Sequence, residues 1–327
     1  MLNNLKYLKL HKSKIYNLIK YMDKSYLLFL NLTFLTVAIY SLFSKTLIDE
    51  KLYCFLLVLA CTTCYSEIRK DVNWIPFLIL AIPFIFFVLY ASIYGYDFWG
   101  KILSWQLSKD IVINLNPIFK KIPLNDAYFA RLYKTDTLTW FFRLVYNNGF
   151  VLPVLIPIYR AAMAKDFKKM LKYALSGHLL QIFLISPFYL TFHLQEVWYV
   201  LGNPDGLARN LSPQAAAGVT LNCFPSMHTS IAFAMFLLVL REKNKIFKYT
   251  WSFFCISVIL STMYLQIHWV LDVIAGIILA YVTVKLVDLI LDILKLNLYS
   301  ILDIFYYNKS FNLSNKNYLD ITNHMNY

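Results

Sequence analysis

The sequence predicts an all-α fold: a polytopic integral membrane helical bundle of about eight transmembrane helices with a six-helix catalytic core. Composition gives the first reason. The 327 residues are 59% hydrophobic and only 15% charged, whereas a soluble domain has roughly a quarter charged residues. The mean hydropathy is accordingly high, at +0.55. Apolar runs of about 20 residues, enough to cross a bilayer as a helix, recur along most of the chain.

Eight apolar segments are long enough to be considered as spans. The second, fourth and sixth are short or interrupted by polar residues. In chain order the segments are 25–43, 46–66, 72–96, 142–157, 171–192, 224–240, 249–268 and 270–290.

Basic residues predict the orientation of these helices. The net charge of +13 comes from lysines and arginines that gather at the ends of apolar runs, which is typical of topology determinants and of contacts with anionic headgroups. Nucleic-acid binding is therefore not expected. The predicted parts are a basic cytoplasmic N-terminus (1–24), N-terminal transmembrane helices (25–96), an outer interfacial segment (97–136), a catalytic transmembrane core (137–292) and a cytoplasmic tail (293–327).

Two short motifs lie at the same predicted end of the sixth to eighth segments. The first is Phe224-Pro225-Ser226-Met227-His228-Thr229-Ser230, and the second is His268-Trp269-Val270-Leu271-Asp272. The chain between them is long enough to cross a bilayer and return. Both motifs should therefore meet at one membrane surface, the non-cytoplasmic one.

The residue types in these motifs suit phosphate chemistry. A helix start with the hydroxyls of Ser226 and Thr229 forms an anion-binding cup. Asp272 lies four residues after His268, so its carboxylate can accept the Nδ1–H of that imidazole and leave Nε2 as a nucleophile. His228 can then protonate a leaving oxygen.

These residues resemble a known family. Pro225-Ser226-Met227-His228 and Ser261-Thr262 with His268 and Asp272 are similar to the second and third signature motifs of the type 2 phosphatidic acid phosphatase superfamily, most closely its inositol phosphorylceramide synthase and sphingomyelin synthase group. The resemblance covers residues 202–276. It implies that His268 forms a phosphohistidine, that Asp272 orients it, and that His228 acts as general acid and then base. It implies no metal and no cofactor.

The departures from the phosphatase pattern indicate the substrate. Met227 stands where the phosphatases have glycine, Thr262 stands where they have a phosphate-gripping arginine, and the upstream Lys-Arg-Pro motif is absent. A phosphodiester carries less charge than a phosphomonoester and needs fewer cations. Arg209 and Arg143 are the remaining candidates for a cation that binds the phosphate.

The sequence thus predicts a lipid phosphotransferase of the inositolphosphotransferase or phosphorylceramide synthase type. Its partners would be a phospholipid donor, a lipid hydroxyl acceptor and the bilayer, while protein partners are left open. A lipid phosphatase with the same residues and water as acceptor is the nearest alternative. A metal-dependent membrane enzyme, with two histidines and one aspartate as ligands, and a transporter or non-catalytic protein are alternatives from other classes.

Ser176-Gly177-His178 also resembles the Ser-Gly-His sequence that the phosphatases have at the first histidine motif. It lacks the proline and should lie on the cytoplasmic half of the fifth helix, remote from His268. A polar contact between helices is the interpretation preferred for His178.

Overall fold

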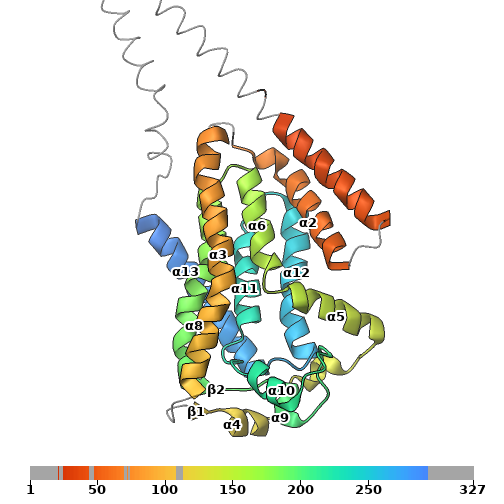
Figure 1. Cartoon of the computed structure of the whole chain (residues 1–327), viewed down its shortest axis with the longest axis vertical. Coiled ribbons are helices and arrows are strands. Elements are labelled where there is room, and N and C mark those ends of the chain that lie inside the picture. The colour runs from red at the N-terminus through yellow and green to blue at the C-terminus, as the bar shows by residue number, and fades with distance from the viewer. Residues whose placement is uncertain are drawn as a thin grey trace, which may run out of the picture.

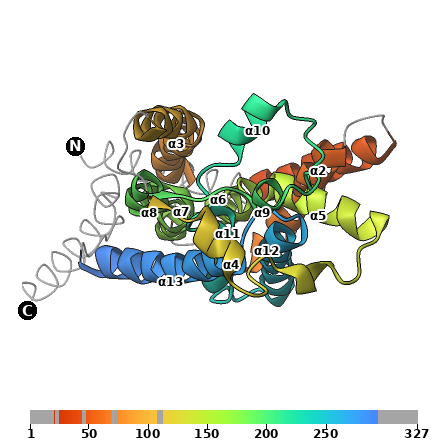
Figure 2. The ribbon, with the colours of Figure 1, turned by 90° about the horizontal axis from the view of Figure 1, so that it is seen from below.

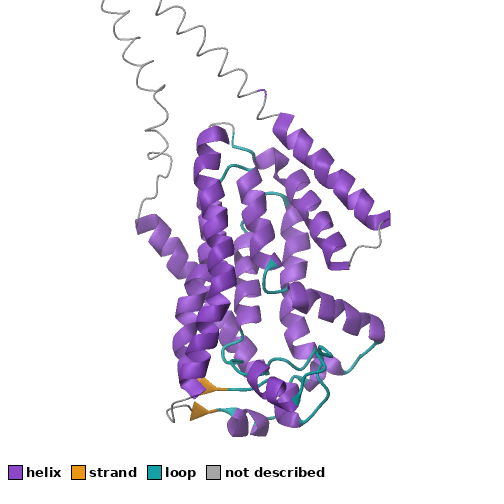
Figure 3. Cartoon of the chain, viewed as in Figure 1, coloured by secondary structure: helices purple, strands orange, loops and turns teal. Residues whose placement is uncertain are grey.

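The computed structural model describes residues 21, 25–43, 48–69, 72, 74–107 and 113–293. Helices account for nearly all of the regular structure in this part of the chain (Figure 3), which confirms the all-α prediction. The predicted N-terminal segment 1–24, apart from Tyr21, and the tail beyond residue 293 lie outside the described residues.

The helices follow one another with short connections (Figure 1). A first helix, Ser25–Phe43, is followed by α2 (Ile48–Cys64), η1 (Tyr65–Glu67), α3 (Trp74–Leu107), α4 (Asn116–Lys121), η2 (Tyr128–Arg131), α5 (Asp136–Asn148), α6 (Leu152–Met163), α7 (Phe167–Ala174), the π-helical turn η3 (Leu175–Leu179), α8 (Leu180–Thr191), α9 (Val197–Leu201), α10 (Pro213–Val219), α11 (Met227–Val239), α12 (Lys245–Tyr264) and α13 (Val270–Ile293). Two-residue strands β1 (Ile113–Asn114) and β2 (Phe192–His193) pair in parallel.

Several of these helices are long and apolar enough to cross a membrane. Four pass by length and composition: Ser25–Phe43, Phe167–Thr191, Lys245–Tyr264 and Val270–Ile293. A bent pair formed by α5 and α6 makes a fifth candidate, and Phe77–Ala91 and α11 are shorter apolar helices. The chain is therefore a multi-pass membrane protein.

The fourth expected span, 142–157, is wrong as a single helix. The chain breaks between α5 and α6, and the two helices are bent by 60°. Gly149 ends α5, and Pro153 lies in the first turn of α6, where proline fits because that turn needs no N–H partner. The third expected span also differs, because α3 continues beyond residue 96 to Leu107.

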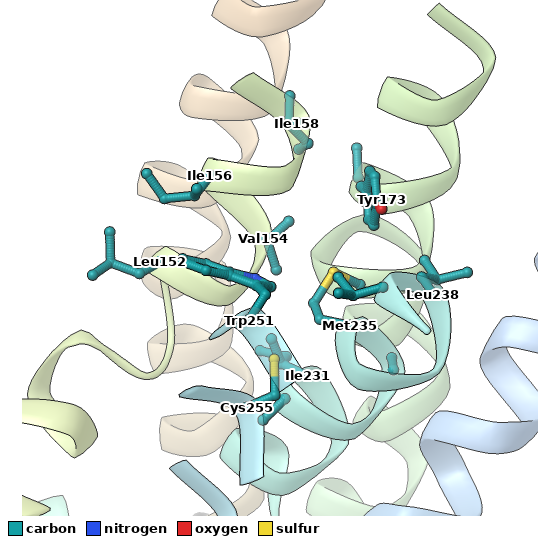
Figure 4. Close-up of a cluster of buried hydrophobic side chains, with 14 of the residues drawn as sticks. Leu152, Val154, Ile156, Ile158, Tyr173, Ile231, Met235, Leu238, Trp251 and Cys255 are labelled. Atoms are coloured by element: carbon teal, nitrogen blue, oxygen red, sulfur yellow. The ribbon is translucent and has the colours of Figure 1, made fainter. Parts of the chain in front are cut away.

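The core lies between α6, α11 and α12 (Figure 4). Trp251 of α12 is completely buried and donates its indole N–H to the carbonyl of Pro153 at 3.2 Å. Met235 and Ile231 of α11 pack beside it, with Leu152 of α6 on the other side. Interlocked side chains of this kind pack the middle of the bundle together.

A buried ion cluster lies at the end of the bundle where α6 ends. Arg160 is 2% exposed, and its guanidinium contacts Glu67 at 2.9 Å and Glu242 at 2.8 Å. Lys169 reaches the same two carboxylates, and the Tyr173 hydroxyl donates to Glu242 at 2.6 Å. These contacts join the segment after α2 to α6, α7 and the end of α11.

The opposite end of the bundle carries a layer of loops and short helices, here called the loop cap (residues 113–135, 192–226 and 265–269). It contains α4, α9, α10 and the β1–β2 pair, which cover the bundle when it is viewed from that end (Figure 2). The helices α11 and α13 both begin at the loop cap.

Removal of the central cation should destabilise the fold. In Arg160→Met, Glu67 and Glu242 lose their buried partner, and loss of one member of a buried ion pair costs about 3 kcal/mol or more. The melting temperature of the detergent-purified protein should fall clearly. Lys168→Met is the control, because Lys168 is 46% exposed and its carboxylate partner is 4.0 Å away. Equal melting temperatures for both variants would contradict a stabilising role of the cluster.

Candidate active site

His268 and Asp272 form a buried pair at the start of α13. The Nδ1 atom of His268 lies 3.2 Å from Oδ2 of Asp272. His268 is 5% exposed and Asp272 is completely buried. A hydrogen bond from Nδ1–H to the carboxylate leaves the lone pair on Nε2, which is the tautomer a nucleophilic imidazole needs.

The turn between α12 and α13 fixes the position of this pair through its backbone. The carbonyl of Thr262 accepts from the backbone N–H of Ile267 and of His268, at 3.0 and 3.1 Å. Asn125 of the loop cap then accepts from the first N–H groups of α13 with its own carbonyl, from Val270 at 2.8 Å, and with its side chain, from Leu271 at 3.0 Å. Such caps satisfy donors that a helix start leaves free.

The start of α11 packs directly on α13. The backbone N–H of Ser226 donates to the carbonyl of Asp272 at 3.1 Å, so the two motifs are joined by a hydrogen bond. Gly276, one turn further along α13, permits this approach. A Cβ atom there would lie 2.6 Å from the carbonyl oxygen of Ser226, which is closer than side chains allow.

His228 projects from the first turn of α11 toward His268. The centroids of the two imidazole rings are 6.3 Å apart. Tyr146 of α5 stacks on His228 at 4.2 Å, and Phe150, in the bend before α6, contacts it at 5.1 Å. The bent pair that replaces the expected fourth span therefore forms one wall of the site.

His178 shares an aromatic neighbour with His228. Its ring lies 5.3 Å from that of Phe150, which also contacts His228. It belongs to the π-helical turn η3, where α7 and α8 meet near the middle of a continuous helix. His178 and His228 thus contact the same phenylalanine ring. The expected position of His178 on the cytoplasmic half of the helix, remote from His268, stays a prediction.

Ser226 and Thr229 are buried and paired with each other. The Ser226 hydroxyl donates to Oγ1 of Thr229 at 2.9 Å and accepts from the backbone N–H of Thr229 at 3.3 Å. In this arrangement they cap α11. The predicted contact of these hydroxyls with phosphate stays a prediction.

Arg209 and Arg143 both lie against the 205–206 turn of the loop cap, and both already contact protein groups. Arg209 binds Asp205 at 2.8 Å and also pairs with Glu196. Burial would raise the pKa of Asp205, but the hydrogen bonds from Arg209 outweigh it and hold that pKa below its ordinary value. Arg143 donates its Nε–H to the carbonyl of Gly206 at 2.8 Å. Their predicted role in gripping phosphate therefore stays a prediction.

Sequence reasoning did not find Tyr146, Phe150, Asn125 and Cys223 as neighbours of the site. Tyr146 and Phe150 are aromatic residues within an apolar segment and have no distinguishing pattern around them. Their contact with His228 depends on the bend at Gly149. Asn125 lies in a segment predicted to rest on the membrane surface. Cys223 immediately precedes Phe224 in the first histidine motif. This position next to the motif is the feature of the sequence that could have indicated Cys223 as a neighbour of the site.

Comparison with known families agrees with this geometry. The family model of the PAP2 superfamily, whose motifs the sequence resembles, matches residues 187–292. This region therefore contains a PAP2 domain, and it includes His228, His268 and Asp272. Members of the superfamily are phosphatases or phosphotransferases, so the enzyme class predicted from the motifs is confirmed at that level. No curated protein and no solved structure matches the chain.

The close approach of α11 to α13 can be tested at Gly276. In Gly276→Ala the new methyl group must push the Ser226 backbone away, and overpacking of this kind costs about 1–3 kcal/mol. We expect a lower melting temperature in detergent. Gly218→Ala in α10 is the matched control, because a Cβ there meets nothing within 4 Å. An unchanged melting temperature in Gly276→Ala would show that the two helix starts are not tightly packed.

Proposed function

We propose that this protein is a membrane lipid phosphotransferase, similar to inositol phosphorylceramide synthase and sphingomyelin synthase, that acts through a phosphohistidine on His268. The observation that carries the proposal is the arrangement of His228 opposite a buried His268–Asp272 pair within one PAP2 domain. Asp272 orients the nucleophile, and His228 transfers protons.

In the first step Nε2 of His268 attacks the phosphorus of a phospholipid. The new P–N bond forms as the P–O bond to the diacylglycerol oxygen breaks, and His228 donates a proton to that oxygen. The phospho-headgroup stays on His268. In-line displacement needs the two imidazoles on opposite sides of the phosphorus, with each reacting contact about 3–3.5 Å long. Two such contacts end to end put the ring centroids about 8 Å apart. The centroids are 6.3 Å apart here, so the imidazoles must separate when a phospholipid enters between them.

In the second step a lipid hydroxyl, such as that of ceramide or diacylglycerol, attacks the phosphohistidine. His228 now accepts the hydroxyl proton as the new P–O bond forms and the P–N bond breaks. Water in place of the lipid would give a phosphatase. Exclusion of water therefore separates the two activities.

The limited positive charge at the site supports a diester substrate. Thr262 is completely buried and its hydroxyl donates to the carbonyl of Ile259 at 2.7 Å, so this position supplies no cation where phosphatases have arginine. The N-termini of α11 and α13 both lie at the site and add the partial positive charge of two helix starts. A singly charged phosphodiester needs less compensation than a doubly charged monoester.

The proposal includes the side of the membrane on which the reaction takes place. Basic residues are frequent in the connections at the bundle end opposite the loop cap, which supports a cytoplasmic location for that end. The active site would then face the non-cytoplasmic side. The basic residues that carry this argument are Arg69, Arg160, Lys165, Lys168, Lys169, Lys172, Arg241, Lys243, Lys245 and Lys248.

Replacement of the nucleophile should abolish activity. We expect His268→Ala to lower the rate by several orders of magnitude and to lose the covalent intermediate, because the variant lacks the imidazole that Asp272 orients for attack on phosphorus. Brief incubation with phospholipid labelled at phosphorus, followed by denaturation, should leave acid-labile label on the native protein and none on the variant. His193→Ala is the control. A non-catalytic protein or a transporter would retain its function in His268→Ala.

The acceptor decides between transferase and phosphatase. Detergent-purified protein is incubated with headgroup-labelled phospholipid, with and without ceramide. We expect a new labelled lipid only when the acceptor lipid is present, because the second step requires its hydroxyl. Free labelled headgroup phosphate that is independent of added lipid would instead identify a phosphatase.

A further inference from the structure

Cys223 places a thiol beside the His268–Asp272 pair. The Sγ atom of Cys223, one ring nitrogen of His268 and one carboxylate oxygen of Asp272 all lie within 4.8 Å of one another. All three residues are buried. The mechanism proposed above uses the histidine and the aspartate but gives no role to the thiol.

One carboxylate oxygen of this cluster has no hydrogen-bond partner, and the thiol has only weak ones. The Oδ1 atom of Asp272 is buried without a hydrogen-bond partner among the described residues, and an unpaired carboxylate oxygen is costly in such an environment. The Cys223 thiol donates to the carbonyls of Thr220 at 3.5 Å and Ile267 at 3.8 Å, which are weak hydrogen bonds that a metal–thiolate bond can replace. The cluster thus presents a sulfur, a nitrogen and an oxygen ligand that are all available to one ion.

This ligand set suits a soft or borderline divalent metal. Thiolate, imidazole and carboxylate are the ligands of tetrahedral zinc, at about 2.0–2.3 Å from the ion, so that neighbouring ligand atoms lie roughly 3.5 Å apart. The separations of up to 4.8 Å then need to close by about 1 Å. Hard ions such as Mg²⁺ prefer oxygen ligands and would not select this cluster.

The site is placed so that the loop cap and α13 supply different ligands. Cys223 of the loop cap is held by its backbone N–H, which donates to the carbonyl of Leu194 at 3.2 Å. His268 lies in the turn before α13, and Asp272 lies in the first turn of α13. Two of the three ligands are four residues apart in sequence, and the contact of 3.2 Å between Nδ1 of His268 and Oδ2 of Asp272 fixes their mutual geometry.

We propose that Cys223, His268 and Asp272 form an inhibitory binding site for a zinc-type divalent metal ion, and that occupation of this site removes the catalytic imidazole from the reaction. The inference rests on the proposed function only for its inhibitory part. An ion on His268 takes the lone pair that would attack phosphorus or breaks the hydrogen bond to Asp272 that orients the ring. This donor set differs from the two-histidine, one-aspartate set of the alternative metal-dependent enzyme, because it contains Cys223 in place of His228.

Binding must displace the thiol proton. Burial raises the pKa of Cys223 well above its ordinary value, so the free protein holds the thiol form. The metal ion replaces this proton, which passes to solvent, and the thiolate–metal bond compensates for the buried charge. Without metal the thiol is therefore a weak nucleophile and does not compete with His268.

Cobalt provides a direct probe of the site. Full-length protein in detergent is titrated with Co²⁺, which binds in place of Zn²⁺. A near-ultraviolet charge-transfer absorption appears only when a thiolate is a ligand of the Co²⁺ ion. We expect this absorption in the native protein, its loss in Cys223→Ser, and its retention in Cys255→Ser. Cys255 is the matched control because it is a free cysteine, completely buried, on α12. Asp272→Asn keeps the size of the third ligand and should weaken Co²⁺ binding by about tenfold or more.

Inhibition is measured separately, with Zn²⁺ and with each variant compared to its own metal-free activity. The half-inhibitory Zn²⁺ concentration should rise by about tenfold or more in Cys223→Ser and stay unchanged in Cys255→Ser. Absence of the thiolate absorption in the native protein, or its persistence in Cys223→Ser, would overturn the proposal. The Co²⁺ titration requires no turnover, so a native protein that binds Co²⁺ but transfers no phosphate would refute the proposed function alone.

Discussion

The contact between the starts of α11 and α13 is the constraint on which the site depends. The Ser226 N–H donates to the carbonyl of Asp272, and Gly276 leaves room for the Ser226 backbone. This hydrogen bond sets the distance between the start of α11, which carries His228, and the start of α13, where Asp272 holds His268. The helix positions fix the two imidazoles because one belongs to a helix and the other is bonded to a helix residue. A larger residue at position 276 would therefore separate His228 from His268 without touching either ring.

The loop cap holds this pair of helix starts from the other side. Asn125 accepts from the first N–H groups of α13, and the indole of Trp269 donates to the carbonyl of Gln195 at 2.9 Å. Gly206 lies so close to the turn after α12 that a Cβ atom would be 1.9 Å from the Leu265 carbonyl. Segments up to about 150 residues apart in sequence thus meet around five residues of the α12–α13 turn. The loop cap is part of the catalytic support.

The two ends of the bundle use polar interactions for different purposes. At the end near α7, Arg160 and Lys169 neutralise Glu67 and Glu242, so the cluster is a closed set of charges that joins helices. Beside the loop cap the hydrogen bonding of a buried carboxylate is incomplete, since the second oxygen of Asp272 has no partner among the described residues. A site that binds a proton, a substrate or an ion needs such an unpaired polar group. In a protein with no such role the unpaired group would only lower stability.

The sequence by itself determined the fold class, most of the helices and the identity of the residues that meet at the site. Periodic apolar runs predict helices because a bilayer demands internal hydrogen bonding, and the i, i+4 spacing of His268 and Asp272 is local geometry. The tertiary structure decided the bend between α5 and α6, and with it the contact of Tyr146 and Phe150 with His228. It also decided that Arg209 pairs with Asp205 and Glu196, and that Cys223 adjoins His268. These features depend on long-range packing, which no short window of sequence encodes, because each partner lies on a different element.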